Sequence, residues 1–180
     1  MKRDWCEIPK VVPLPPGGWS DDDGKISEYI DGRWIRKPDI GRVDTSMTIQ
    51  AILRSLWPFR EAVGGEILSG WHMLAVPDLL RPDVVMSFPR YSNYDGYLVA
   101  PAFLTVEVRV DKEQISALVR KCREKYHPFG TPFCWIIDIA RREGYECHRD
   151  SDEPVIRQTL TAGAHVSLSV EQVFHQVDRP

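Results

Sequence analysis

Paired cysteines, an excess of positive charge and long apolar runs are all missing from this chain of 180 residues. The formal net charge of −3 excludes a protein coated with positive charge, although a local basic patch stays open. The four cysteines have no CxxC or metal-ligand spacing, so we expect buried thiols at Cys122 and Cys134. No stretch could span a bilayer, and the charged, proline-rich N-terminus lacks the apolar core of a signal peptide. We therefore expect a cytoplasmic protein that does not associate with membranes.

Several common catalytic signatures are also missing. The chain has no GxSxG motif, and its five histidines have no HExxH spacing. Gly65 and Gly70 have the spacing of a P-loop, but Trp71 stands where that motif requires lysine. Serine hydrolase, zinc protease and P-loop chemistry are therefore disfavoured.

The composition is that of an ordinary globular protein, with 43% hydrophobic and 27% charged residues. Residues 1–24 are rich in Pro, Gly and Asp, which predicts a flexible arm. The remaining length fits one domain, which we place at residues 25–178.

Short strands alternate with two helices along this predicted domain, and a short helix is expected through Val173-Phe174. Asp31-Gly32, between two short runs that contain Tyr and Trp, predicts an N-terminal β-hairpin. Helices are predicted over 45–56 and 112–126 from their apolar spacing and flanking Pro or Gly residues. Strands are predicted near 66–68, 71–75, 83–87, 102–110, 133–138, 144–148 and 166–170. This pattern predicts an α/β (mixed α+β) fold with a central mixed β-sheet flanked by helices.

Two of these strands each carry one acid in apolar surroundings. Asp83 begins the run Asp83-Val84-Val85-Met86, and Glu107 lies within Leu104–Val110. A buried acid needs a cation, a hydrogen-bond donor or a metal as partner. Two acids on neighbouring strands could hold one divalent metal. Alternatively, Asp83 caps a turn, and Glu107 pairs with Arg109 or with a cation of the next helix.

The acids stand in a recognisable series of motifs. Arg81-Pro82-Asp83-Val84 is followed by Thr105-Val106-Glu107-Val108, then by Lys121, Tyr126 and Trp135-Ile136-Ile137-Asp138. Their order and spacing resemble the Uma-two-type family of candidate restriction endonucleases, which belongs to the PD-(D/E)xK nuclease superfamily. The similarity runs from about Glu28 to Val173. It implies a restriction-endonuclease-like fold.

The resemblance also implies a metal site. Asp83 and Glu107 would ligate Mg²⁺ or Mn²⁺ together with the Val108 carbonyl. The superfamily's usual lysine position holds Arg109 here. In the Uma-two-type family the lysine lies on the following helix instead, which points to Lys121.

The catalytic lysine has a second candidate. Lys125 lies one helical turn after Lys121, on the same flank of the apolar stripe. Helical geometry therefore permits either, and the spacing of Lys121 from Glu107 fits the family. Tyr126 comes one residue later after Lys121 than is usual in the family, so the register of this helix stays open. Either lysine would orient or deprotonate the attacking water.

The function implied by the resemblance is metal-dependent hydrolysis of phosphodiester bonds, with double-stranded DNA as the expected substrate. Arg81, Arg109 and Lys125 are candidate substrate contacts. A homodimer is plausible by analogy with nucleases that cut both strands. The alternative is a nuclease fold that no longer cuts and binds nucleic acid or protein. Reading the two acids as a glycoside hydrolase pair is disfavoured, because no aromatic sugar platform lies near either.

Overall fold

The structure is a computed structural model that describes residues 27–37, 43–87, 97–110 and 113–179. The predicted arm, residues 1–24, lies outside these ranges. Within them, no helix combines the length and the apolar character that crossing a membrane requires.

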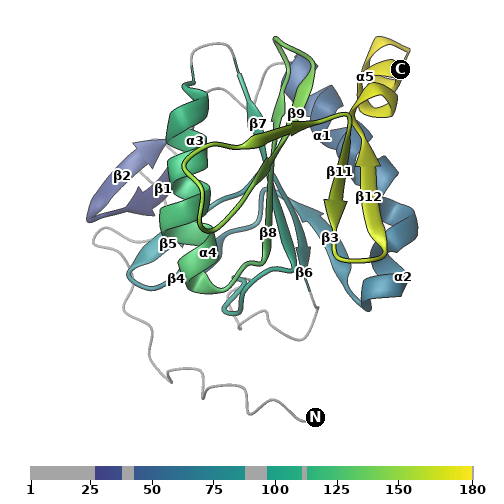
Figure 1. The fold of residues 1–180 in the computed structure, drawn as a ribbon. Coiled ribbons are helices and arrows are strands. Elements are labelled where there is room, and N and C mark those ends of the chain that lie inside the picture. The colour runs from purple at the N-terminus through teal and green to yellow at the C-terminus, as the bar shows by residue number, and fades with distance from the viewer. Residues whose placement is uncertain (1–26, 38–42, 88–96, 111–112, 180) are drawn as a thin grey trace.

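A six-stranded mixed sheet forms the centre of the molecule (Figure 1). β7 and β8 are parallel, whereas the other neighbouring pairs of this sheet are antiparallel. The strand order is β10 (Val155–Arg157), β9 (Glu143–Cys147), β8 (Phe133–Asp138), β7 (Leu104–Arg109), β6 (Val84–Ser87) and β3 (Glu66–Ser69). The predicted mixed sheet is therefore confirmed, with the Glu107 strand at its middle.

Each face of this sheet is covered by a separate apolar cluster. Because side chains alternate along β8, Trp135 and Ile137 pack on one face and Ile136 on the other. The first face is covered by α1 (Val43–Leu56), α5 (Val170–Asp178) and the hairpin of β11 (Thr159–Ala162) and β12 (Val166–Ser169). The second face is covered by α3 (Ile115–Lys121), as Figure 1 shows.

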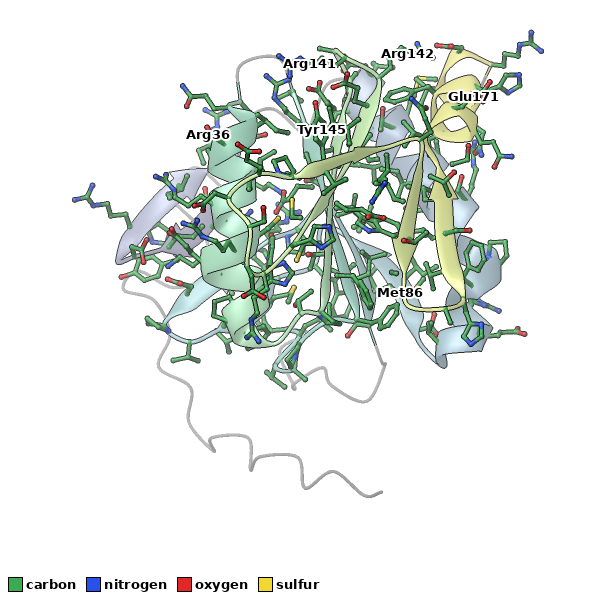
Figure 2. All side chains as sticks on the ribbon, in the orientation of Figure 1. Arg36, Met86, Arg141, Arg142, Tyr145 and Glu171 are labelled. Atoms are coloured by element: carbon green, nitrogen blue, oxygen red, sulfur yellow. The ribbon has the colours of Figure 1, made fainter. Side chains whose placement is uncertain are left out.

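The α1 helix ends where the sequence predicts. Pro58 has no N–H to donate to a carbonyl of the preceding turn, and the chain passes there from α1 into the 3-10 turn η1 (Trp57–Phe59). A short helix α2 (Arg60–Val63) then leads to β3. Charged side chains are exposed in the turn between β8 and β9 and on α5, where Figure 2 labels Arg141, Arg142 and Glu171.

The predicted N-terminal hairpin is present and belongs to a second sheet. Asp31 and Gly32 have positive φ angles of 51° and 78°, as a tight two-residue turn requires. The strand order of this sheet is β2 (Arg33–Arg36), β1 (Ser27–Ile30), β5 (Asp78–Leu80) and β4 (Met73–Ala75). The hairpin lies beside α3 in Figure 1, so its strands approach the face of the central sheet that carries Glu107.

The helix predicted over 112–126 differs from the prediction. It begins at Ile115 and changes after Lys121 into a π-helical turn, η3 (Cys122–Tyr126), which leads into α4 (His127–Phe129). Apolar periodicity does not reveal such a turn, because the buried stripe of Leu118, Cys122 and Tyr126 is kept through it. The short strands β5, β10 and β11 also escaped prediction, since three or four residues give no clear alternation.

Candidate active site

The two predicted acids lie side by side and are buried. Asp83 directly precedes β6 and is 4% exposed, whereas Glu107 lies within β7 and is 1% exposed. The Asp83 N–H donates to Val106 O at 3.1 Å, which brings the start of β6 against β7. The Val108 N–H donates to Asp83 Oδ2 at 2.7 Å. The backbone of one strand therefore orients the carboxylate of the other.

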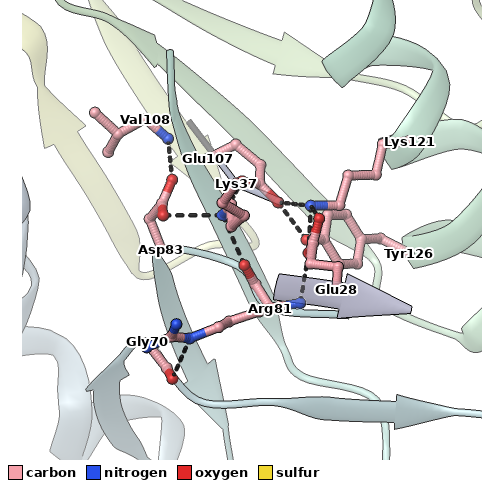
Figure 3. Close-up of polar contacts among 9 residues, drawn as sticks. All are labelled: Glu28, Lys37, Gly70, Arg81, Asp83, Glu107, Val108, Lys121 and Tyr126. Carbon is pink, nitrogen blue, oxygen red and sulfur yellow. Dashed lines mark hydrogen bonds and ion pairs between the residues drawn. The ribbon is translucent and has the colours of Figure 1, made fainter. Parts of the chain in front are cut away.

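Both acids converge on one cation, the ammonium group of Lys37. Its Nζ lies 2.9 Å from Asp83 Oδ1 and 2.8 Å from Glu107 Oε2 (Figure 3). The same atom donates to Arg81 O at 2.6 Å. Three oxygen atoms, two from the loop before β6 and one from β7, thus surround a single buried positive charge.

A second lysine, Lys121 at the end of α3, contacts Glu107. Lys121 Nζ lies 2.7 Å from Glu107 Oε1, and the Tyr126 hydroxyl donates to the same oxygen. In a regular α-helix, residues five apart are separated by about 140° around the axis, so the two side chains would diverge. The π-helical turn between them brings both to the same face. The turn thus accommodates the five-residue spacing between Lys121 and Tyr126.

The hairpin contributes a third carboxylate. Glu28, on β1, accepts hydrogen bonds from Lys121 Nζ at 2.6 Å and 2.7 Å through its two oxygens. It also accepts from the Arg81 N–H at 2.5 Å. Glu28 therefore ties the hairpin to the helix and to the loop before Asp83, as Figure 3 shows.

Sequence reasoning missed both Glu28 and Lys37. Glu28 did carry a signal, because it stands beside Tyr29 and Ile30 in a predicted strand and is, like Glu107, an acid among apolar residues. Lys37 follows the hairpin and carries no such signal in the sequence. Its role depends on contacts with acids 46 and 70 residues away along the chain.

The remaining predicted site residues have other partners. Arg109 forms an ion pair with Asp138 at 2.6 Å and therefore does not neutralise Glu107. Glu107 pairs instead with a cation of the following helix, Lys121. Lys125 contacts two other carboxylates, those of Asp31 at 2.5 Å and Asp78 at 2.8 Å. It joins the hairpin turn to β5 and does not contact the acid pair.

Arg81 lies at the entrance to the acid pair. Its guanidinium Nε donates to Gly70 O at 2.8 Å. A pocket of about 240 Å³ opens there between α1 and β3, and Asp83 forms part of its wall. A second pocket, of about 250 Å³, lies between the hairpin and α3, and Glu28, Lys37 and Lys121 line it. Of these two pockets, the first reaches the acid pair through Asp83, whereas neither acid lines the second.

Burial and neighbouring charges shift the pKa values of the four groups of the cluster. Burial raises the pKa of Glu107, but the charges of Lys121 and Lys37 outweigh it and lower that pKa to about 2. Burial raises the pKa of Asp83, while Lys37 opposes this shift. Burial lowers the pKa of each lysine, yet the neighbouring carboxylates raise both above the usual value. The lysines therefore stay protonated.

Glu113 is a further titratable group beside the cluster. Burial raises its pKa to about 7, and the negative charge of Glu107 adds to the shift. It lines the pocket between the hairpin and α3. A carboxyl group with a pKa near neutrality is suited to exchange protons, and the sequence carried no signal for it.

The acid pair suits a hard divalent cation by its chemistry. Asp83, Glu107 and the Arg81 carbonyl all present oxygen atoms to one point, and Mg²⁺ prefers oxygen ligands. In the described part of the chain, no group of three or more His, Cys, Asp or Glu side chains is arranged to hold a metal ion. The donor set therefore fits a metal held by two carboxylates and completed by backbone and water, in the place that the Lys37 ammonium now takes.

Comparison with solved structures finds a nuclease-like fold. A candidate nuclease belonging to DUF820 from Anabaena variabilis superposes with a TM-score of 0.67. The superposition covers 84% of this chain and 90% of the other at 15% identity. DUF820 corresponds to the Uma-two-type family that the sequence resembles. No protein-family model matches the chain, and no curated protein does so significantly. The chain therefore shares the fold of this nuclease.

Proposed function

We propose that the protein is a metal-dependent endonuclease that hydrolyses phosphodiester bonds, with double-stranded DNA as substrate and Mg²⁺ or Mn²⁺ as cofactor. The observation that carries this proposal is the convergence of Asp83 and Glu107 on one cation position. The shared fold with a candidate nuclease supports it.

The residues of the cluster have complementary roles in this proposal. Asp83 and Glu107, with the Val108 carbonyl as a predicted third ligand, would hold the metal. When bound, the metal lowers the pKa of a coordinated water and offsets negative charge on the phosphate. Lys121, 2.7 Å from Glu107, would orient the attacking water and stabilise charge developing on the scissile phosphate. Tyr126 holds Glu107 in place through its hydroxyl.

The proposed substrate contacts are the basic side chains of Arg81, Arg109 and Lys125. Arg81 lines the pocket that reaches Asp83, so it is well situated to contact a phosphate. Arg109 and Lys125 already have carboxylate partners, which a phosphate would have to replace. A homodimer that cuts both strands remains a prediction from the resemblance.

The decisive test is metal-dependent cleavage by isosteric variants. Asp83→Asn and Glu107→Gln should each lower the rate of plasmid cleavage with Mg²⁺ or Mn²⁺ by about 100-fold or more, because each removes a ligand charge. Glu171→Gln, an exposed acid on α5, serves as the matched control and should cleave at the wild-type rate. Circular dichroism should show that all three variants remain folded. Equal cleavage by wild type and both site variants would contradict the proposal.

A second candidate function is a nuclease fold that binds nucleic acid or protein without cutting. The observation that favours it is the mutual neutralisation of the cluster, in which two lysines already satisfy the carboxylates. Such a module would bind a labelled DNA duplex with the same affinity with and without Mg²⁺, measured by fluorescence anisotropy. It would show no cleavage with either metal ion.

A further inference from the structure

We infer that Lys37 acts as a built-in competitor of the metal, so that a divalent ion can bind Asp83 and Glu107 only after the Lys37 ammonium has left. This inference rests on the proposed function, because it assumes that the acid pair is a metal site. It assigns a regulatory role to a residue outside the acid–lysine motif that the sequence resembles.

The first argument is that the Lys37 ammonium fills the cation position completely. An ammonium group has three N–H donors. Lys37 Nζ has three acceptors, Arg81 O at 2.6 Å, Asp83 Oδ1 at 2.9 Å and Glu107 Oε2 at 2.8 Å. The Lys37 side chain is only 6% exposed. The ammonium is therefore saturated with the oxygens that a metal would need.

The second argument is mutual exclusion. Mg²⁺ binds its oxygen ligands at about 2.0–2.1 Å, so an ion on Asp83 Oδ1 and Glu107 Oε2 would lie almost where Lys37 Nζ lies. Two positive charges at that separation repel strongly in a site shielded from water. The ion and the ammonium therefore cannot share the acid pair.

The third argument is that Lys37 can leave without disturbing the acids. It directly follows β2, whose four residues are exposed or half-buried, whereas the acids belong to the central sheet. β2 pairs with β1 at the end of its sheet. Withdrawal of Lys37 thus requires movement at a sheet edge and leaves β6 and β7 in place.

The consequence is a measurable penalty on metal affinity. When only a fraction of molecules is competent to bind, the apparent dissociation constant rises by the inverse of that fraction. Replacing Lys37 by an uncharged side chain of similar length removes the competitor. It also leaves two buried carboxylates without the cation that they share. A bound metal ion can then supply the missing positive charge.

The first experiment compares Mn²⁺ binding by titration calorimetry in wild type, Lys37→Met and Arg33→Met. Arg33 lies on the same hairpin and is exposed, so its variant matches the charge change away from the site. Lys37→Met should bind Mn²⁺ about tenfold or more tightly than wild type, whereas Arg33→Met should match wild type. The melting temperature of Lys37→Met should fall without metal and rise with Mn²⁺ by more than that of wild type.

Two outcomes of this experiment have distinct meanings. Equal Mn²⁺ affinity in wild type and Lys37→Met would overturn the competition and leave the proposed function standing. Absence of Mn²⁺ binding in both would overturn the competition and the metal-dependent function together.

A second experiment uses the unaltered protein, so it does not depend on the folding of a variant. Acetylation of lysine side chains is followed by mass spectrometry with and without saturating Mn²⁺. Lys37 should be protected without metal and become several-fold more reactive with it, because its amine leaves the acid pair. Lys125, which pairs with Asp31 and Asp78, should change little. Protection of Lys37 that persists at saturating Mn²⁺ would overturn the inference.

Discussion

Glu107 is hydrogen-bonded to three side chains, Lys37, Lys121 and Tyr126, although it lies inside a β-strand. Removal of one partner from a buried ion pair leaves an uncompensated charge, which costs about 3–5 kcal/mol. Replacement by a neutral residue of the same shape costs less, because hydrogen bonds can be kept. Asn and Gln variants therefore test chemistry at this site better than Ala variants, which would also unbalance the fold.

His72 provides a prediction at the residue scale. Burial lowers its pKa to about 4, and the nearby positive charges of Arg81 and Lys37 add to the shift. Between pH 6.5 and 4 the unfolded chain therefore takes up a proton at this residue before the folded protein does. The contribution of His72 to stability is complete above pH 6.5 and is lost as the pH falls to about 4.

Urea denaturation at pH 7 and pH 4.5 measures this effect. Wild type should lose more stability over that interval than His72→Gln, whose side chain does not titrate. Glu113, with a pKa raised to about 7, shifts stability in the opposite direction, but it is present in both proteins and drops out of the comparison. An identical pH dependence in the two proteins would show that His72 titrates normally in the fold.

At the scale of elements, the β1–β2 hairpin is as important to the site as the central strands. It carries Glu28 on one strand and Lys37 directly after the other. Its turn is anchored by Lys125 through Asp31, and the Asp31 N–H also donates to Asp78. The hairpin and the π-helical turn η3 thus bring their side chains to one carboxylate from different directions.

The tight turn predicts the effect of Gly32→Ala. Gly32 has φ 78°, a conformation that residues with a Cβ adopt at a cost of about 1 kcal/mol. We expect faster amide hydrogen exchange in β1 and β2, measured by mass spectrometry, and unchanged exchange in β7 and β8. Gly163→Ala, at φ 63° near the β11–β12 hairpin, is the control and should affect only that region. Faster exchange throughout the central sheet in Gly32→Ala would contradict this local assignment.

At the scale of the whole molecule, one sheet is shared by two apolar clusters. α1 packs against the face that carries Trp135, and α3 packs against the face that carries Ile136. Both clusters include side chains of β6 and β8, so neither face can be lost without exposing the other side of the same strands. We therefore expect the described part of the chain to unfold as a unit.

The variant Ile52→Ala tests this cooperativity. Ile52 lies in α1 and is 0% exposed, so the cavity should lower the free energy of unfolding by about 2–5 kcal/mol. Tryptophan fluorescence and far-ultraviolet circular dichroism should report the same shifted urea midpoint. Two separated transitions would show that the faces unfold independently.

Much of the fold and part of the site could be predicted from local patterns. The central strands are continuous apolar runs, and α1 has a proline after its last turn, so short windows of sequence were sufficient. Asp83 and Glu107 were singled out because an acid in an apolar strand is itself a signal. Lys121 was predicted from its spacing to Glu107, which fits the family that the sequence resembles. Apolar periodicity could not decide whether Lys121 or Lys125 lies next to Glu107, because it does not reveal the π-helical turn that changes the direction of side chains after Lys121.

The sequence by itself determined the alternation of strands and helices, the tight hairpin turn and the burial of two acids, because each depends on residues close together along the chain. Only the tertiary structure decided which cation neutralises those acids. Lys37 and Glu28 lie 70 and 93 residues from the partners they contact, Glu107 and Lys121. Such pairings depend on how the hairpin packs against the central sheet and helix, and no local pattern encodes that packing.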